Sequence, residues 1–147
     1  MRRRAFVLAS LAAACTGTTS APAQAGKLKR VGWIGAGAGS KDEPDAALGE
    51  EFVGRLRELG WVDGKTVELL KRRPGGDPAR VEVMLRELVA QKVDVIFAPF
   101  GPHASAARKV AGSIPIVFAI TSDPVRSGLT GSLARPDRNA TGPSTMF

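Results

Sequence analysis

Three small polar residues, Thr121, Ser122 and Asp123, follow directly on an apolar run and are the first candidates for chemistry. In that run, residues 114–120, β-branched and aromatic side chains occur on both faces, which is typical of a strand buried in a parallel sheet. Ligands bind outside the carboxyl ends of such strands. We therefore expect the three residues to contact a ligand, with Asp123 pairing with an amine. Capping or turning the chain is the alternative role for each.

A second group of candidates lies where another strand pattern gives way to a short helix: Phe100, Gly101, His103 and Ala104. The first N–H groups of a helix have no partner within it and can bind an anion. We expect the amides of Gly101, His103 and Ala104 to point outward and to hold a carboxylate without the help of a charged side chain. Together with Asp123, such amides would suit an amino acid.

The Gly-rich run 35–40 offers a third set of contacts. It matches a dinucleotide-binding fingerprint poorly, because Ser40 stands in the place of the third glycine. The second predicted strand also ends in the basic residues 71–73 instead of the acidic residue that would hold a ribose. We predict no nucleotide cofactor here, and expect Gly35 and Ala36 to line the same ligand crevice.

Catalytic and metal-binding groups are scarce in this sequence. His103 is the only histidine and Cys15 the only cysteine, whereas metal sites built on nitrogen and sulfur need several such ligands. No G-x-S-x-G nucleophile motif is present. Asp42, Glu43 and Asp45 cluster in a polar segment where solvation or capping is expected. We predict no catalytic residue, no metal site and no cofactor.

Strand and helix patterns alternate along the chain with short connections, which predicts an α/β fold with a parallel sheet and helices on both faces. Strands are expected at 31–35, 66–70, 93–98 and 114–120, and helices at 45–60, 77–92 and about 103–111.

Several residues define the expected helix ends and buried faces. Asp45 and Asp77 are predicted N-caps, with Pro78 at the first helical position, and Gly60 is a predicted C-terminal cap. The first helix has an apolar stripe formed by Leu48, Phe52, Leu56 and Leu59, and the second has one formed by Val81, Leu85, Leu88 and Val89.

The net charge of +7 lies mostly at the amino terminus. Six of the 21 Lys and Arg residues lie before Val31, where there is no acidic residue, and from Val31 onward 15 basic residues face 14 acidic ones. The chain also contains no tyrosine. Clustered cations and stacking aromatics are what a nucleic-acid module needs, so we expect no nucleic-acid partner.

Residues 1–25 have the three parts of a secretory signal peptide. Arginines at 2–4 precede an apolar segment at 5–14, which is too short to span a membrane, and Ala23-Gln24-Ala25 is a small-residue cleavage signal. The arginines also resemble a twin-arginine export signal. We expect export to the periplasm by either route. Residues 11–15 loosely resemble a lipoprotein box, so a lipid anchor at Cys15 is an alternative.

The order and spacing of several motifs resemble one bacterial family. The motifs are LRELGWVDG at 56–64, VDVI at 93–96, IPIVF at 114–118, DPV at 123–125, GL at 128–129, SLARP at 132–136 and NATG at 139–142. With them, the chain from Val31 to Met146 is similar to ABC-transporter substrate-binding proteins of the tryptophan/tyrosine-uptake type.

This resemblance implies a type I periplasmic-binding-protein fold, in which two α/β lobes joined by hinge strands close on a ligand. The family's ligand loops follow strands one, three and four, which here correspond to Gly35 and Ala36, to 100–104 and to 121–123. It implies an exported solute-binding component of an ABC importer, with a small molecule such as an aromatic or other amino acid and a permease as partners. Relatives continue into a second lobe, so 26–147 is expected to be an N-terminal lobe, a fragment or a solitary unit.

Two other functions fit the same fold class. An enzyme on a doubly wound sheet would need an acid/base pair, a metal cluster or a nucleotide fingerprint, and none stands out in the sequence. A ligand-sensing domain of a regulator would ordinarily lack an export leader. Turnover of a substrate without a partner would favour the enzyme, and a cytoplasmic location would favour the regulator.

Overall fold

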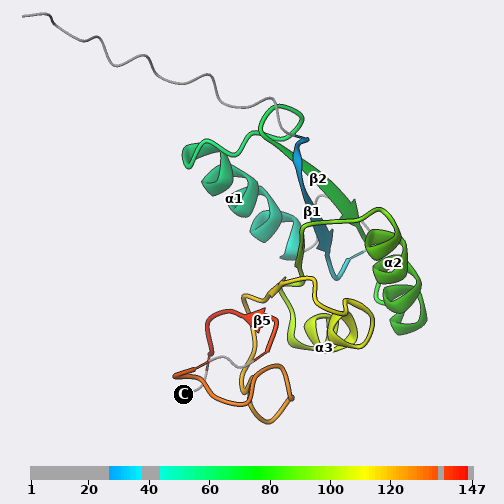
Figure 1. Cartoon of the computed structure of the whole chain (residues 1–147), viewed down its shortest axis with the longest axis vertical. Helices are drawn as coiled ribbons and strands as arrows, with labels where there is room; N and C mark the ends of the chain where they lie inside the picture. Colours follow the sequence, from blue (N-terminus) through cyan, green and yellow to red (C-terminus); the bar gives the residue numbers. More distant parts are fainter. Residues whose placement is uncertain (1–26, 38–43, 136–137, 146–147) are drawn as a thin grey trace, which may run out of the picture.

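The computed structural model describes residues 27–37, 44–135 and 138–145. The predicted signal peptide at 1–25, with Cys15, lies outside these residues. The described part forms five strands and three helices (Figure 1). In chain order they are β1 (Lys29–Ile34), α1 (Pro44–Glu58), β2 (Val67–Arg72), α2 (Pro78–Ala90), β3 (Val95–Phe97), α3 (Gly101–Val110), β4 (Ile116–Val117) and β5 (Ala140–Thr141).

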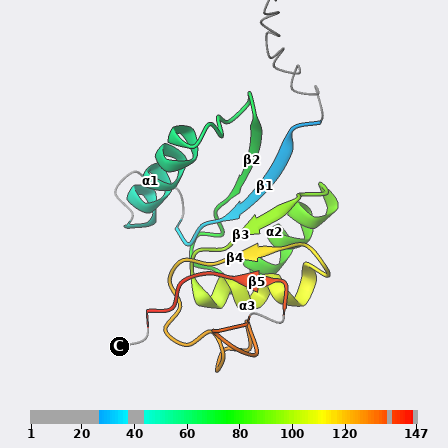
Figure 2. The same cartoon turned by 60° about the vertical axis from the view of Figure 1, so that its left-hand side comes forward.

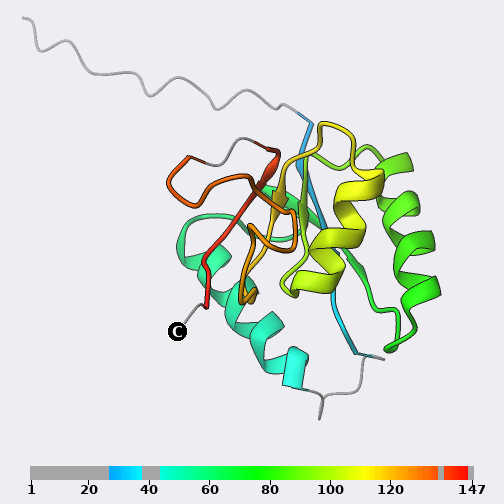
Figure 3. The same cartoon turned by 90° about the horizontal axis from the view of Figure 1, so that it is seen from below.

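The strands form one sheet in the order β2-β1-β3-β4-β5, and every neighbouring pair is parallel. Figures 2 and 3 show α1 on one face of this sheet and α2 and α3 on the other. The predicted α/β class, with a parallel sheet covered on both faces, is therefore confirmed. Because all strands run in the same direction, their carboxyl ends lie at one edge of the sheet.

The main apolar core lies between the sheet and the pair α2 and α3. Neighbouring residues of β1 separate the two faces, as the period of two in a strand requires. Ile34 belongs to this core, together with Leu85 and Leu88 of α2. Further fully buried members of the core are Ile96, Ala98, Ala104, Ala107 and Ile116.

An aromatic cluster fastens α1 to the opposite face of the sheet. The ring of Phe52 stacks on that of Phe97 with a centroid separation of 4.0 Å, and it meets the edge of Trp33 at 5.7 Å. Gly49 lies against the same indole, because a Cβ at this position would come 2.2 Å from a Trp33 ring carbon. Two aromatic contacts and a close glycine thus hold α1, whereas α2 and α3 are held by a continuous aliphatic core.

Two predicted helix ends are confirmed. The Asp77 side chain accepts a hydrogen bond of 2.9 Å from the amide of Ala79, as an N-cap does. Gly60 has φ +86, its amide donates to the Arg57 carbonyl, and the next amide, Trp61, donates to Leu56 at 2.8 Å. These paired bonds form a Schellman motif, which ends α1.

The expectations for two residues of α1 were wrong. The helix begins at Pro44, so Asp45 lies inside it and is not the N-cap. Leu59 is 75% exposed and does not extend the buried stripe. The reason is that α1 ends at Glu58, and the Schellman turn carries Leu59 out of the helical repeat.

The strands near the carboxyl terminus also differ from the prediction. The expected strand at 114–120 is reduced to Ile116–Val117. Phe118 still donates to Thr141 of β5, but Ala119 and Ile120 donate to the Pro99 carbonyl, which lies beyond the end of β3. The sequence did not predict β5, since a two-residue strand of Ala and Thr carries no apolar pattern. None of the described helices is long and apolar enough to span a membrane.

Candidate ligand-binding site

A pocket of about 530 Å³ lies at the carboxyl ends of β3 and β4. Five residues predicted to contact a ligand line it, and they come from two loops far apart in the sequence. These five are Phe100, Gly101, Thr121, Ser122 and Asp123. The structure therefore brings the two main candidate segments together.

Backbone hydrogen bonds hold the two segments side by side. The Pro99 carbonyl accepts from the amides of Ala119 (3.0 Å) and Ile120 (2.7 Å). The Gly101 amide donates in return to the Ile120 carbonyl at 3.1 Å, and Phe100 and Ile120 form an isolated parallel bridge. The first residue of α3 is thus fixed directly against the chain that leaves β4.

The hydroxyl of Thr121 is buried in the wall of this pocket. Thr121 is 5% exposed, and its Oγ1 has no hydrogen-bond partner among the described residues. A Cβ at position 101 would lie 3.2 Å from this oxygen, so Gly101 leaves room beside it. Buried polar groups are nearly always hydrogen-bonded, and an unmade bond costs about 1–3 kcal/mol. A ligand atom in the pocket could supply the missing bond.

Asp123 stabilises a turn and also lines the pocket, which are the two alternative roles expected for it. Its Oδ1 accepts a 2.8 Å bond from the Arg126 amide, and its carbonyl accepts a 3.0 Å bond from Ser127. These bonds form a turn that carries Ser127 to the pocket. The side chain is only partly buried and also lines the pocket, where it is the one acidic residue among the described lining residues.

The predicted set of outward amides at the start of α3 is not present as expected. The Gly101 amide donates to Ile120, and the Ala104 amide donates to the Phe100 carbonyl at 2.9 Å. Ala104 is also fully buried in the core, so its side chain cannot reach the pocket. Two of the three amides are therefore occupied, that of Gly101 by the segment after β4 and that of Ala104 by the N-cap residue of α3. The prediction of an anion site built on all three amides was wrong.

Three other predicted site residues lie outside this pocket: Gly35, Ala36 and His103. The Gly35 amide donates to Arg72 at 2.9 Å, and the Ala36 carbonyl accepts from Gly76 at 3.0 Å, so this loop is tied to the one after β2. His103 lies in the first turn of α3, as expected, with its ring edge-on to that of Phe100. It lines a separate hollow of about 130 Å³ with residues of α2. None of the three lines the pocket of Thr121.

Pro102 also lines the pocket, within the loop 100–104 that the family resemblance implied, and four lining residues were missed from the sequence: Ser105, Ile120, Ser127 and Thr145. Ser105 could have been found, since it lies one helical turn after Gly101 on the same face of α3. Thr145 could not, because its place depends on the unpredicted strand β5. After that strand its amide donates to the Thr121 carbonyl at 2.9 Å.

Comparisons with known proteins agree with a ligand-binding fold. Residues 47–147 match the family described as ABC transporter substrate binding protein. A tyrosine-binding protein of Clostridioides difficile strain R20291 is 31% identical over 93 residues, which make up 63% of this chain and 27% of that protein. This chain therefore spans about a quarter of the length of that curated relative.

Solved structures show the same fold. An open, ligand-free substrate-binding protein with adhesive properties from Clostridium difficile superposes with a TM-score of 0.73 at 28% identity. A conserved domain protein from Vibrio cholerae gives 0.71 at 28% identity. The match covers 82% of this chain and 40% of the solved chain in both cases. The predicted likeness to a periplasmic-binding-protein fold is confirmed.

Proposed function

Because this chain belongs to the ABC transporter substrate-binding protein family, we propose that it captures a small solute and delivers it to the permease of an ABC importer. The family consists of solute-binding proteins that work outside the cytoplasm, and it is not an enzyme class. In this chain the pocket at the ends of β3 and β4 is the proposed solute site.

The buried hydroxyl of Thr121 is the observation that carries this proposal. A buried polar atom without a partner lowers stability, and such a local defect is expected at a functional site. The hydroxyl lies in the wall of the pocket, where it can donate to or accept from a bound solute. The ligand-free chain bears the energetic cost, and a correctly placed solute removes it.

An aromatic or other amino acid is the solute that we propose. Phe100 and Ile120 supply apolar walls for a side chain, while the Asp123 carboxylate can receive an ammonium group. The likeness to a tyrosine-binding protein supports the same class of ligand. No cofactor, metal or catalytic residue enters this proposal.

We further propose that residues 26–147 form one lobe of a two-lobe clamp. Ile120 is 45% exposed beside the pocket, and Val125 and Leu133 in the following loop are exposed as well. Exposed apolar side chains of this kind mark an interaction surface. A second lobe closing on them would bury both the apolar surface and the solute.

Export is the remaining part of the proposal. The leader at 1–25 would direct the chain to the periplasm, through the general or the twin-arginine route. A lipid anchor at Cys15 is the alternative way of holding it near the permease.

The test combines a ligand screen with one pair of variants. The chain is titrated with L-tyrosine, L-tryptophan and the other amino acids while its melting temperature is followed, since binding to the native state raises it. Thr121→Val should weaken binding of the best amino acid about tenfold, the equivalent of roughly 1.4 kcal/mol. Thr121→Ser, which keeps the hydroxyl, should bind within about threefold of the original chain. A solute bound equally by the Val variant would contradict this site.

A further inference from the structure

A second pocket lies beside the solute pocket along α3. It has a volume of about 380 Å³ and shares two serines, Ser105 and Ser127, with its neighbour. The other described residues that line it are Arg108, Lys109, Gly128 and Arg138. Three cationic side chains and two hydroxyls thus surround one hollow, and no acidic residue is among its described lining residues.

Arg108 is the partly buried cation of this pocket, and no described carboxylate lies within salt-bridge distance of it. Four other arginines of the described chain pair with a glutamate in the same structure: Arg30, Arg55, Arg72 and Arg86. A guanidinium that is partly desolvated without an acidic partner favours an anion from outside the chain.

The backbone at Gly128 lies beside this guanidinium. Gly128 has φ +70, and its amide donates to the Val125 carbonyl at 2.9 Å. A Cβ at this position would lie 3.8 Å from Nη1 of Arg108. The turn that begins at Asp123 therefore places a residue without a side chain next to the guanidinium, and Ser127 at the pocket wall beside it.

The remaining charges increase the positive character of the pocket. Glu82 is the acidic residue that Lys109 influences: Arg86 lowers the pKa of Glu82 most, by a hydrogen bond and by its charge, and Lys109 adds a smaller effect. Glu82 already pairs with Arg86 at 2.7 Å. Lys109 has no salt-bridge partner among the described residues, and Arg138 also lines the pocket, from the segment before β5.

We propose that this pocket binds a phosphate-class oxyanion, either a free ion or the head group of an anionic lipid. Guanidinium groups bind the oxygens of phosphate in a bidentate manner, and the serine hydroxyls can donate to a third oxygen. Arg108 and Lys109 also lie in the last turn of α3, where cations favour the helix dipole. That local role does not explain Ser127 and Arg138, which come to the pocket from other parts of the chain.

The first experiment measures binding of inorganic phosphate to the chain by calorimetry, with sodium chloride of equal ionic strength as the reference. The chain should show saturable binding, and Arg108→Gln should weaken it about tenfold or more, the equivalent of at least roughly 1.4 kcal/mol. Arg57→Gln is the matched control, because Arg57 is exposed on α1, on the opposite face of the sheet. It should bind phosphate as the original chain does.

Two further variants keep the result interpretable. Arg108→Lys retains the charge but not the fork, so its loss should be intermediate, and it replaces the Gln variant if that chain does not fold. Thr121→Val should leave phosphate binding unchanged while it weakens the solute site. Failure of the proposed solute function is thereby distinguished from failure of the anion site.

The second experiment identifies the source of the oxyanion. Vesicles of phosphatidylcholine with and without phosphatidylglycerol are sedimented with each variant. Binding that needs phosphatidylglycerol and Arg108 supports a lipid head group, and binding of inorganic phosphate alone supports a free ion. The proposal is overturned if neither probe binds above the chloride reference, or if Arg108→Gln binds as tightly as the original chain. In that case Arg108 and Lys109 serve only the end of α3.

Discussion

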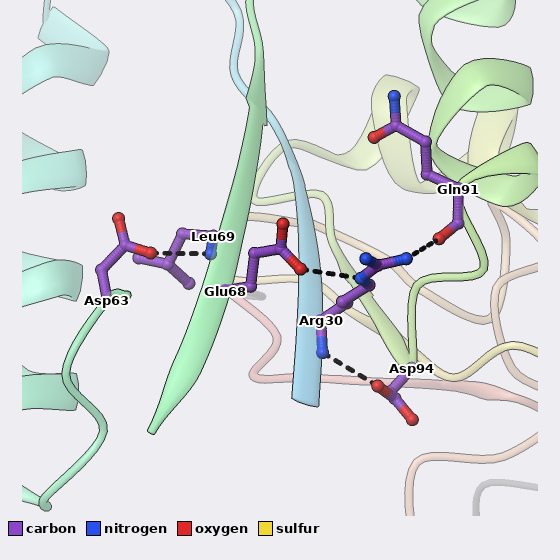
Figure 4. Close-up of polar contacts among 6 residues, drawn as sticks. All are labelled: Arg30, Asp63, Glu68, Leu69, Gln91 and Asp94. Carbon is purple, nitrogen blue, oxygen red and sulfur yellow. Dashed lines mark hydrogen bonds and ion pairs between the residues drawn. The ribbon is translucent and has the colours of Figure 1, made fainter. Parts of the chain in front are cut away.

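The two ends of the sheet are built in contrasting ways, and the amino end is closely tied by side chains. There the Arg30 amide donates to Asp94 at 2.8 Å, and its guanidinium donates to Glu68 at 2.7 Å and to the Gln91 carbonyl at 2.9 Å (Figure 4). Asp63 accepts a further 2.9 Å bond from the Leu69 amide. Each of these polar groups has a partner supplied by the chain itself.

At the carboxyl end of the sheet, some side chains remain available for contact with a ligand or a partner. Thr121 keeps a buried hydroxyl without a partner in the described chain, and Ile120 stands 45% exposed beside it. The contacts that hold this end together are mainly between backbone groups, from Pro99, Gly101 and the segment after β4. The difference separates stability from function, because the unpaired hydroxyl and the exposed apolar side chain both lie where a ligand binds in sheets of this kind.

The largest expected effect tests whether backbone packing alone shapes the carboxyl end. Gly142 follows β5, and a Cβ there would come 2.1 Å from the Phe118 carbonyl oxygen and 2.6 Å from its ring. Gly142→Ala must therefore push β5 away from β4, with an expected loss of about 1–3 kcal/mol in the free energy of unfolding. Urea denaturation measures this loss.

Gly54→Ala is the matched control for that substitution. Gly54 lies within α1, and a Cβ there meets nothing within 4 Å. Alanine is the better helix former, so this variant should gain up to about 1 kcal/mol. If Gly142→Ala proved as stable as the original chain, the close approach of β5 would not be what shapes the pocket edge.

A smaller effect on the free energy of unfolding is expected to distinguish two buried threonine hydroxyls at the carboxyl end of the sheet. Thr130 is buried, and its hydroxyl donates to the Ser132 carbonyl at 2.9 Å, whereas that of Thr121 has no described partner. Thr130→Val should therefore lower the free energy of unfolding by about 1 kcal/mol, and Thr121→Val should leave it unchanged or raise it by up to about 1 kcal/mol. Thermal unfolding of the ligand-free chain checks both. Equal losses would mean that Thr121 has a partner within the chain.

Sequence reasoning predicted the parts of this fold that local chemistry determines. The N-cap at Asp77 and the C-terminal cap at Gly60 depend on neighbouring residues only, and both are present. The apolar residues of α2, with Leu85 and Leu88 fully buried, follow from helical periodicity. Thr121 was found because small polar residues stand out directly after an apolar run.

Backbone hydrogen bonds between segments far apart in the sequence could not be predicted in this way. β5 pairs with β4, which lies more than twenty residues earlier in the chain, and the residue types of Ala140–Thr141 do not indicate this pairing. The Gly101 amide was expected to be available to a ligand, but it donates a hydrogen bond to the Ile120 carbonyl. The same pairing placed Ile120 at the pocket rather than inside a strand. Tertiary hydrogen bonds of this kind have no signature in either partner's local sequence.

The smallest expected effect concerns the acid sensitivity of the amino end. The backbone hydrogen bond from Arg30, followed by the side-chain bond from Lys29, holds the pKa of Asp94 below its ordinary value. A carboxyl group whose pKa is lower in the folded state contributes stability above its unfolded pKa, and loses that contribution as pH falls through the folded pKa. Asp94 thus favours the folded chain at neutral pH, and protonation below about pH 4 removes this contribution.

Asp94→Asn should therefore lower stability slightly at neutral pH and flatten its fall in acid, measured as denaturation midpoints over a pH series. Glu82→Gln is the control: Arg86 also lowers the pKa of Glu82, but this pair lies exposed on the helix surface, where solvent screens it, so its effect should be smaller still. An unchanged pH profile in Asp94→Asn would show that the carboxylate adds nothing at that edge. Backbone pairing would then hold both ends of the sheet alike, and only the pocket would set them apart.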